Sequence, residues 1–187
     1  MANFVRVTVL GIGALAAIAL SGCVGGPPAA VVTPAPSESP VFASEEEALT
    51  AATEAYAAYL AVSDMITAKE GDQPERIGPL VTAGYRQQEV EGFEEFRRAG
   101  LSTRGQSRFD SLQLQQDPSS LLVADTFTTY ICSDVGLVRI QDDDGIDVTP
   151  PSRPDRIPLE VDFHIASDAP VVLLIERSDV WTGENFC

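Results

Sequence analysis

The sequence predicts an α+β domain in which helices pack on one face of an antiparallel sheet. Two patterns indicate this class. Apolar residues recur at steps of four and three between residues 48 and 66, as on one face of a helix, whereas residues 159–165 alternate apolar and polar, as in a half-buried strand. All helical patterns precede all strand patterns, and this order is typical of α+β domains.

A long helix is expected from Glu45 to about Lys69. Ser44 and Glu47 have the spacing of a capping box, in which the serine accepts a hydrogen bond from a backbone amide and the glutamate reaches back. The apolar face of this helix consists of Ala48, Ala52, Ala55, Tyr59, Val62 and Ile66. Gly71 then provides the signal that ends it.

Two shorter helical segments follow. Residues 74–81 are expected to form a short helix or turn, and a second helix is expected over residues 82–99, with Gly100 directly after its end. Gly84 and Gly92 each weaken this helix by up to about 1 kcal/mol relative to alanine. The side chains expected to face the core are Tyr85, Val90, Phe93 and Phe96.

The chain beyond Ser102 is expected to form an antiparallel meander. Its strands are expected at residues 104–116, 121–133, 137–140, 146–148, 159–165 and 171–181. Turns are expected at residues 117–120, 142–145 and 167–170, where aspartate, serine, proline and glycine gather, and a proline-rich loop at residues 150–158.

The N-terminus resembles the signal peptide of a bacterial lipoprotein. Arg6 precedes an uncharged apolar stretch from Val7 to Leu20, which is shorter than the roughly 20 residues of a spanning helix. Leu20-Ser21-Gly22-Cys23 resembles the lipobox, in which a peptidase cuts before the cysteine and that cysteine carries lipid. The resemblance implies a signal peptide over residues 1–22 and lipid attachment at Cys23, which anchors the protein on the extracytoplasmic face of the cell membrane. An ordinary signal peptide with an incidental cysteine is the alternative.

Residues 23–43 are expected to form a disordered, proline-rich tether. This composition favours extended polyproline II and cannot bury a core. At roughly 3.1 Å per residue, the tether could hold a domain up to about 60 Å from the bilayer. Residues 44–187 then make up one domain.

The formal net charge of −16 argues against nucleic-acid binding, which requires basic surface. It also argues against adsorption of the domain itself on anionic lipid. The expected membrane contact is therefore the acylated Cys23 alone.

The chain has three cysteines, and lipid on Cys23 leaves Cys132 and Cys187 as a pair. Because an exported protein folds in an oxidising compartment, this pair is expected to form a disulfide. The chain-entropy model gives roughly 4 kcal/mol for a loop of this size.

A long first helix, a shorter helical segment and a curved antiparallel sheet resemble the NTF2-like (cystatin-like cone) arrangement. The segments Tyr130–Asp134, Asp144-Gly145 and Trp181–Cys187 are similar to those of small actinobacterial lipoproteins. The resemblance covers roughly residues 45–187, and it implies no catalytic residue that can be placed in this chain.

One candidate for catalysis lies in the strand expected at residues 159–165. His164 shares a sheet face with Glu160 and Asp162, as required of a proton-shuttling dyad, and some NTF2-like enzymes resemble this arrangement. An exposed strand histidine among carboxylates is the alternative, and it is favoured because alternation alone does not provide an enclosed pocket.

No metal or cofactor is expected. The aspartates around Gly145 match only part of a calcium-binding EF-hand loop, because Ile140 and Pro151 occupy two ligand positions. A solvated acidic turn is therefore the favoured interpretation, with a weak calcium site of another type as the alternative.

Aromatic residues could line a ligand cavity, and the candidates retained for this role are Tyr59, Tyr130 and Trp181. Aromatic side chains are more often part of an ordinary core.

The sequence therefore favours a non-enzymatic lipoprotein at the cell envelope whose domain binds an envelope protein or a small ligand. The alternatives are a small-molecule isomerase or hydratase that uses His164 with Asp162 or Glu160 in a cone pocket, and a purely structural envelope protein.

Overall fold

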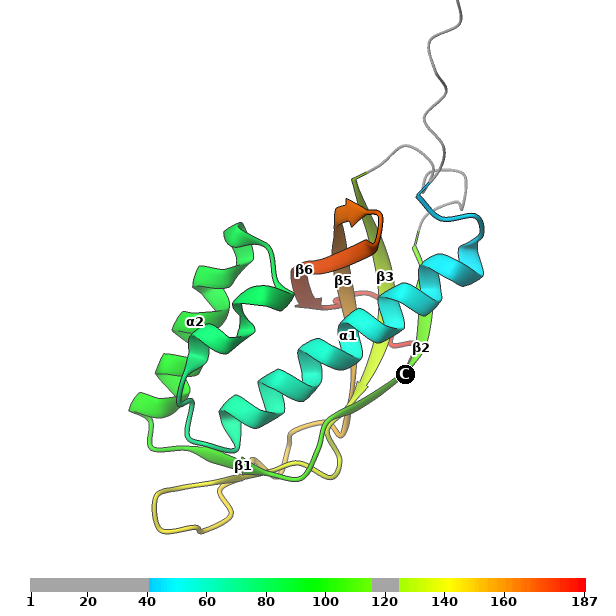
Figure 1. Cartoon of the computed structure of the whole chain (residues 1–187). Helices are drawn as coiled ribbons and strands as arrows, with labels where there is room; N and C mark the ends of the chain where they lie inside the picture. Colours follow the sequence, from blue (N-terminus) through cyan, green and yellow to red (C-terminus); the bar gives the residue numbers. More distant parts are fainter. Residues whose placement is uncertain (1–40, 116–124) are drawn as a thin grey trace, which may run out of the picture. The chain divides into compact units, whose positions relative to one another are not determined.

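The computed structural model describes residues 41–115 and 125–187, and it confirms the α+β class (Figure 1). In chain order the elements are α1 (Glu45–Thr67), the 3-10 helix η1 (Pro74–Leu80), α2 (Ala83–Arg98), β1 (Ser102–Arg104), β2 (Arg108–Leu114), β3 (Thr126–Asp134), β4 (Arg139–Gln141), β5 (Arg156–Asp168) and β6 (Val171–Val180). Among the described residues, no helix is long and apolar enough to cross a membrane. The narrower NTF2-like arrangement stays a prediction, and the signal peptide and Cys23 lie outside the described residues.

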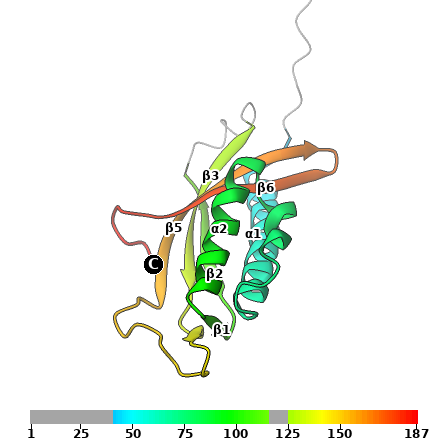
Figure 2. The same ribbon diagram turned by 90° about the vertical axis from the view of Figure 1, so that its left-hand side faces the viewer.

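The main sheet is antiparallel and has the strand order β2-β3-β5-β6, while β1 and β4 pair separately. The strands present alternate residues to two faces. The inner face packs against the helices and includes Phe127, Ile131, Val161, Phe163 and Ile175, all buried in one core with residues of α1. α1 crosses this face, and α2 lies beside α1 and the edge strand β6 (Figures 1 and 2). The outer face points away from the helices.

The start of α1 follows the predicted cap with one difference. The Ser44 hydroxyl accepts from the Glu47 amide at 3.2 Å, whereas the Glu47 carboxylate accepts from the Ala43 amide at 2.7 Å, one residue earlier than in the standard box. The helix ends at Thr67, two residues before the predicted end. Gly71 follows with φ 71°, and a β-carbon there would collide with the Phe93 carbonyl, so this turn requires glycine.

The predicted end of the tether at residue 43 is wrong, because Phe42 belongs to the core. Its side chain is 2% exposed, and its ring packs edge-on against Phe127 with 5.9 Å between centroids. Burial of an aromatic ring stabilises the fold strongly, so the domain already includes this residue.

The single strand predicted at residues 104–116 is also wrong, because the chain breaks between β1 and β2. Gly105 has φ 98° and lies against the Leu137 backbone. Both the amide and the hydroxyl of Ser107 then bind the Asp64 carboxylate, at 2.8 and 2.7 Å. These contacts with α1 and the β3–β4 connection turn β1 toward β4 and away from the main sheet.

The remaining strand predictions need smaller corrections. The turn at residues 142–145 is confirmed, since Gly145 has φ 75° and its amide donates to the Asp142 carbonyl at 2.9 Å. Residues 146–148 form only an isolated bridge through Asp147 and no strand. β5 extends beyond the predicted 159–165 because both β3 and β6 pair with it over most of its length. The turn predicted at residues 117–120 lies outside the described residues.

The Cys132–Cys187 disulfide is confirmed, with 5.5 Å between the α-carbons. Cys132 is fully buried on β3, whereas the C-terminal segment has an exposed surface. The bond therefore ties the C-terminal end of the chain to the centre of the sheet.

Candidate functional site

An open groove of about 430 Å³ lies between α1 and α2. Its lining residues are Tyr59, Ser63, Thr67, Gln88, Glu89, Gly92, Phe93 and Phe96. The three residues from α1 are spaced four apart, so they lie in a row on one helix face. Those from α2 form the opposite wall.

Gly92 keeps the middle of the groove open. A β-carbon at this position would meet no atom within 4 Å, and the same is true of Gly84, the second residue of α2. Both glycines have low helix propensity, but Gly92 lies in the interior of α2, where the cost is full, and Gly92 is the one of the two that lines the groove. A larger side chain at Gly92 would therefore fill this space.

A hydrogen bond between the two helices lies at one end of the groove. The Tyr59 hydroxyl donates to Glu89 Oε2 at 2.7 Å. Tyr59 is 9% exposed, and Glu89 is half-buried. Among the described residues, no lysine, arginine or histidine forms an ion pair with Glu89, so its carboxylate has no cationic partner there.

Burial and the charge of Glu89 act together on the neighbouring tyrosines. Burial raises the pKa of the Tyr59 hydroxyl well above its ordinary value, and the negative charge of Glu89 raises it further. The same two causes raise the pKa of Tyr85. Burial also raises the pKa of Tyr56, although its hydrogen bond with Ser178 opposes this shift. All three hydroxyls are thus held in the neutral form.

The hydroxyl groups on the α1 wall already donate their protons to the helix backbone. Ser63 Oγ donates to the Tyr59 carbonyl at 2.9 Å, and Thr67 Oγ1 donates to the Ser63 carbonyl at 3.1 Å. With its own proton used in this way, Thr67 Oγ1 accepts from the Thr103 hydroxyl at 2.9 Å. The Tyr59 hydroxyl likewise donates its proton to Glu89. What these side chains offer to the groove is therefore lone pairs.

The predicted catalytic candidates lie elsewhere, on the outer face of the sheet. Glu160 and Asp162 bind the Arg177 guanidinium at 2.6 and 2.7 Å, and Asp179 binds it at 2.9 Å. These hydrogen bonds, that of Asp162 first, hold the pKa of Arg177 above its ordinary value. Among the described residues, His164 forms no hydrogen bond or ion pair with either carboxylate, so the expected dyad is not assembled.

The three predicted ligand-binding residues are not brought together. Tyr59 lines the groove between the helices, whereas Tyr130 and Trp181 pack against each other on the outer face, with 5.0 Å between ring centroids. Phe186 contacts Tyr130 from the C-terminal segment at 5.4 Å. Tyr130 and Phe186 in this second aromatic group are close in sequence to Cys132 and Cys187, so the rings join the same two segments as the disulfide.

The aspartates near Gly145 serve the turn itself. Asp142 Oδ1 accepts from the amides of Asp144 and Ile146 at 3.1 and 2.9 Å, and Asp147 accepts from the Thr149 amide at 2.9 Å. The hydrogen bonds from Thr149 hold the pKa of Asp147 below its usual value. Within residues 41–115 and 125–187, no group of three or more potential ligand side chains is placed to hold a metal ion.

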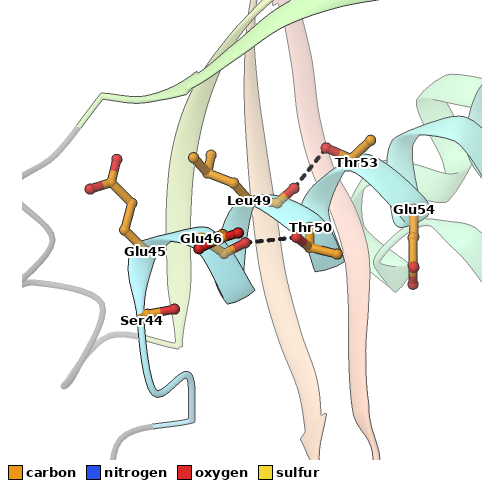
Figure 3. A pocket seen from close by; sticks show the side chains of 7 residues that line it. All are labelled: Ser44, Glu45, Glu46, Leu49, Thr50, Thr53 and Glu54. Carbon is orange, nitrogen blue, oxygen red and sulfur yellow. Dashed lines mark hydrogen bonds between the residues drawn. The ribbon is translucent and has the colours of Figure 1, made fainter.

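A second open groove, of about 680 Å³, follows the exposed side of the first turns of α1 (Figure 3). Its residues are Ser44, Glu45, Glu46, Leu49, Thr50, Thr53 and Glu54. The hydroxyls of Thr50 and Thr53 donate to carbonyls of the same helix, at 2.8 and 2.7 Å. Within residues 41–115 and 125–187, α1 and its N-cap supply this whole lining and no second element forms an opposing wall, so the α1–α2 groove is the better candidate.

Sequence reasoning found Tyr59 but missed Glu89, Ser63 and Thr67. A signal for Glu89 was present: it stands four residues after Tyr85 and four before Phe93, on the face expected to pack inward. A carboxylate at such a position departs from the apolar pattern of that face.

No model of a known protein family matches the chain, and no curated protein matches it either. Among solved structures, it is similar to the intermembrane space region of the chloroplast protein ARC6, with a TM-score of 0.48 and 9% identity over 71% of this chain and 95% of that one. A protein from Catenulispora acidiphila gives a TM-score of 0.43 and 16% identity over 71% and 88% of the two chains. A de novo designed β-sheet protein gives 0.34 and 15% over 71% and 89%. At these values none of the three indicates a function for this chain.

Proposed function

We propose that this chain is a lipoprotein, anchored through acylated Cys23 on the extracytoplasmic face of the cell membrane, whose NTF2-like domain binds a ligand without catalysing a reaction. The binding site is the groove between α1 and α2. The ligand is a small molecule or a side chain of another envelope protein.

The observation that carries the binding role is the half-buried Glu89 carboxylate, which lies in an open groove without a cationic partner among the described residues. Removing a carboxylate partly from water costs free energy unless an opposite charge compensates it. Tyr59 and Tyr85 form hydrogen bonds with this carboxylate and supply no charge. The carboxylate therefore keeps a negative charge that a ligand in the groove can compensate.

Two features support the proposed location. Leu20-Ser21-Gly22-Cys23 resembles a lipobox, and the Cys132–Cys187 disulfide suits a protein that folds in an oxidising compartment. Lipid on Cys23 would provide lasting attachment, because each buried methylene contributes about 0.8 kcal/mol.

The enzymatic alternative has less support. Glu160 and Asp162 are both ion-paired with Arg177, and within the described part of the chain no hydrogen bond or ion pair joins His164 to either of them. A general base must be free to accept a proton from a bound substrate, and these carboxylates are committed to a structural ion pair.

The anchor is tested by labelling cells with radioactive palmitate. We expect the wild-type protein to carry the label and to be found in the membrane fraction. A Cys23→Ala variant should carry no label and should leave the membrane fraction. Incorporation of label that survives this substitution contradicts the anchoring proposal.

Binding is tested in intact cells with a photo-crosslinking amino acid in place of Gln88, at the groove, and in place of Gly84 as the control. Intact-protein mass spectrometry should find a light-dependent adduct at position 88 that is absent at position 84. Adding Gly92→Leu should abolish the adduct. Equal adducts at both positions, or none at position 88, contradict the proposed site.

A further inference from the structure

The polar groups of the groove are mostly acceptors and include the negative charge of Glu89, while the Gln88 amide adds N–H donors. Ser63 and Thr67 direct their protons to backbone carbonyls, and Tyr59 directs its proton to Glu89. The oxygens of Tyr59 and Ser63 keep lone pairs, Thr67 keeps the lone pair that does not accept from Thr103, and the Glu89 carboxylate only accepts. This lining therefore favours a ligand that is rich in donors.

The aromatic lining favours the same type of ligand. Tyr59, Phe93 and Phe96 contribute rings to the groove, and aromatic faces attract cations. The chain as a whole carries a net charge of −16, which raises the local concentration of cations around it. Apolar ring surface next to a carboxylate suits a ligand with an alkyl chain that ends in a positive charge.

The row of acceptors also indicates the type of cation. Ser63 and Thr67 follow Tyr59 at spacings of four residues, and at about 1.5 Å per residue the row from Tyr59 to Thr67 is about 12 Å long. A quaternary ammonium has no N–H and leaves these acceptors unused. A primary ammonium has three donors and no acceptor, and can bind the carboxylate and a neighbouring hydroxyl oxygen together.

We propose that the groove between α1 and α2 binds a primary alkylammonium group, with Glu89 as its counter-ion and Tyr59 holding that carboxylate in place. This inference rests on the proposed function and names the ligand class of the same site. The ammonium belongs either to a free amine or to a lysine side chain of a partner protein, and the test below distinguishes the two sources.

The test is a titration of the full mature chain, extracted from membranes in a mild detergent, with Nα-acetyl-lysine amide as the probe. Binding is followed through the backbone amide resonances of α2. The matched probe carries an additional acetyl group on Nε, which removes the charge and keeps the alkyl chain. We expect the charged probe to bind at least about tenfold more tightly, the loss typical of a missing charge-assisted hydrogen bond.

Two substitutions test the charge of the site and its free space separately. Glu89→Gln removes the charge while its amide oxygen still accepts from Tyr59, and it should weaken binding at least about tenfold. Gly92→Leu fills the groove, raises helix propensity and should abolish binding. The matched controls are Glu94→Gln for charge and Gly84→Leu for the glycine, and both should bind within about twofold of the wild type.

The source of the ammonium is examined with ethanolamine, a free amine without the long alkyl chain. Equal binding of ethanolamine and the lysine derivative supports a free amine, and binding of the lysine derivative alone supports a partner's side chain. If neither probe binds, if the Nε-acetylated probe binds as tightly, or if Glu89→Gln has no effect, the inference is wrong. A crosslinked adduct at position 88 that persists in that case would keep the groove as the binding site and exclude only the ammonium ligand.

Discussion

The hydroxyl of Tyr59 on α1 donates to Glu89 Oε2 on α2 at 2.7 Å, and this bond joins the two long helices directly. The bond stabilises the domain, because the buried Tyr59 hydroxyl donates to the charged carboxylate of Glu89. It also fixes the position of Glu89, the one carboxylate among the described residues that line the groove. Fold stability and ligand binding therefore depend on the same pair of residues.

Removal of the Tyr59 hydroxyl should destabilise the protein. We expect Tyr59→Phe to lower the free energy of unfolding by about 1–2 kcal/mol, since it removes the hydrogen bond that Tyr59 donates to the half-buried Glu89. The control is Tyr130→Phe, which removes an exposed hydroxyl that accepts from Gln115 and should cost less than about 0.5 kcal/mol. Chemical denaturation measures both values, and equal losses would contradict the role of the Tyr59–Glu89 bond.

The tyrosines make the protein sensitive to alkaline pH. The pKa values of Tyr56, Tyr59 and Tyr85 are raised in the folded state, so the folded protein holds these protons more tightly than the unfolded chain. Their contribution to stability is complete below the ordinary tyrosine pKa of 10.0 and is lost as the pH rises above it.

The measurement is a pH titration of phenolate absorbance together with circular dichroism. The chain has four tyrosines, and three of them should ionise only when the protein unfolds. One phenolate, that of Tyr130, can appear while the circular dichroism remains native. If a second phenolate also appears under these conditions, the tyrosines between α1, α2 and β6 are accessible to water and the prediction is wrong.

Phe42 should be part of the stable domain. We expect Phe42→Ala to lower the free energy of unfolding by about 3 kcal/mol, because it leaves a cavity next to Phe127. Phe186→Ala is the matched control, since Phe186 is 39% exposed, and it should cost less than about 1 kcal/mol. If the two variants are equally stable, Phe42 belongs to the tether as the sequence alone suggested.

Loss of the disulfide should weaken the domain without unfolding it. Cys187→Ser removes the bond between β3 and the C-terminus, and the expected loss is about 2–4 kcal/mol. The wild-type protein under reducing conditions should show the same loss. A variant as stable as the oxidised wild type would mean that the C-terminal segment contributes little to the fold.

The elements that could be predicted from sequence are those with local causes. The capping residues and apolar face of α1 predicted its start and its buried side, and alternation predicted the strand that became β5. The compartment implied by the lipobox predicted the disulfide. Each of these signals acts between residues close in sequence or depends on composition.

The missed features depend on contacts between distant residues. The break after β1 follows from the binding of Ser107 to Asp64, 43 residues earlier, and the burial of Phe42 depends on a partner in β3. The pairing of Tyr59 with Glu89 spans 30 residues in the same way. Periodicity reveals which face of an element is apolar, but it does not reveal which polar residue of another element lies opposite.

The proposed location is tested most directly by the intact mass of the protein extracted from membranes. We expect the mass of a chain that begins at Cys23, increased by the attached lipid and reduced by the two hydrogens lost when Cys132 and Cys187 are joined. A mass equal to the full-length chain with free thiols and no lipid would contradict both the anchor and the oxidising compartment, and with them the account of this protein as a ligand-binding lipoprotein of the cell envelope.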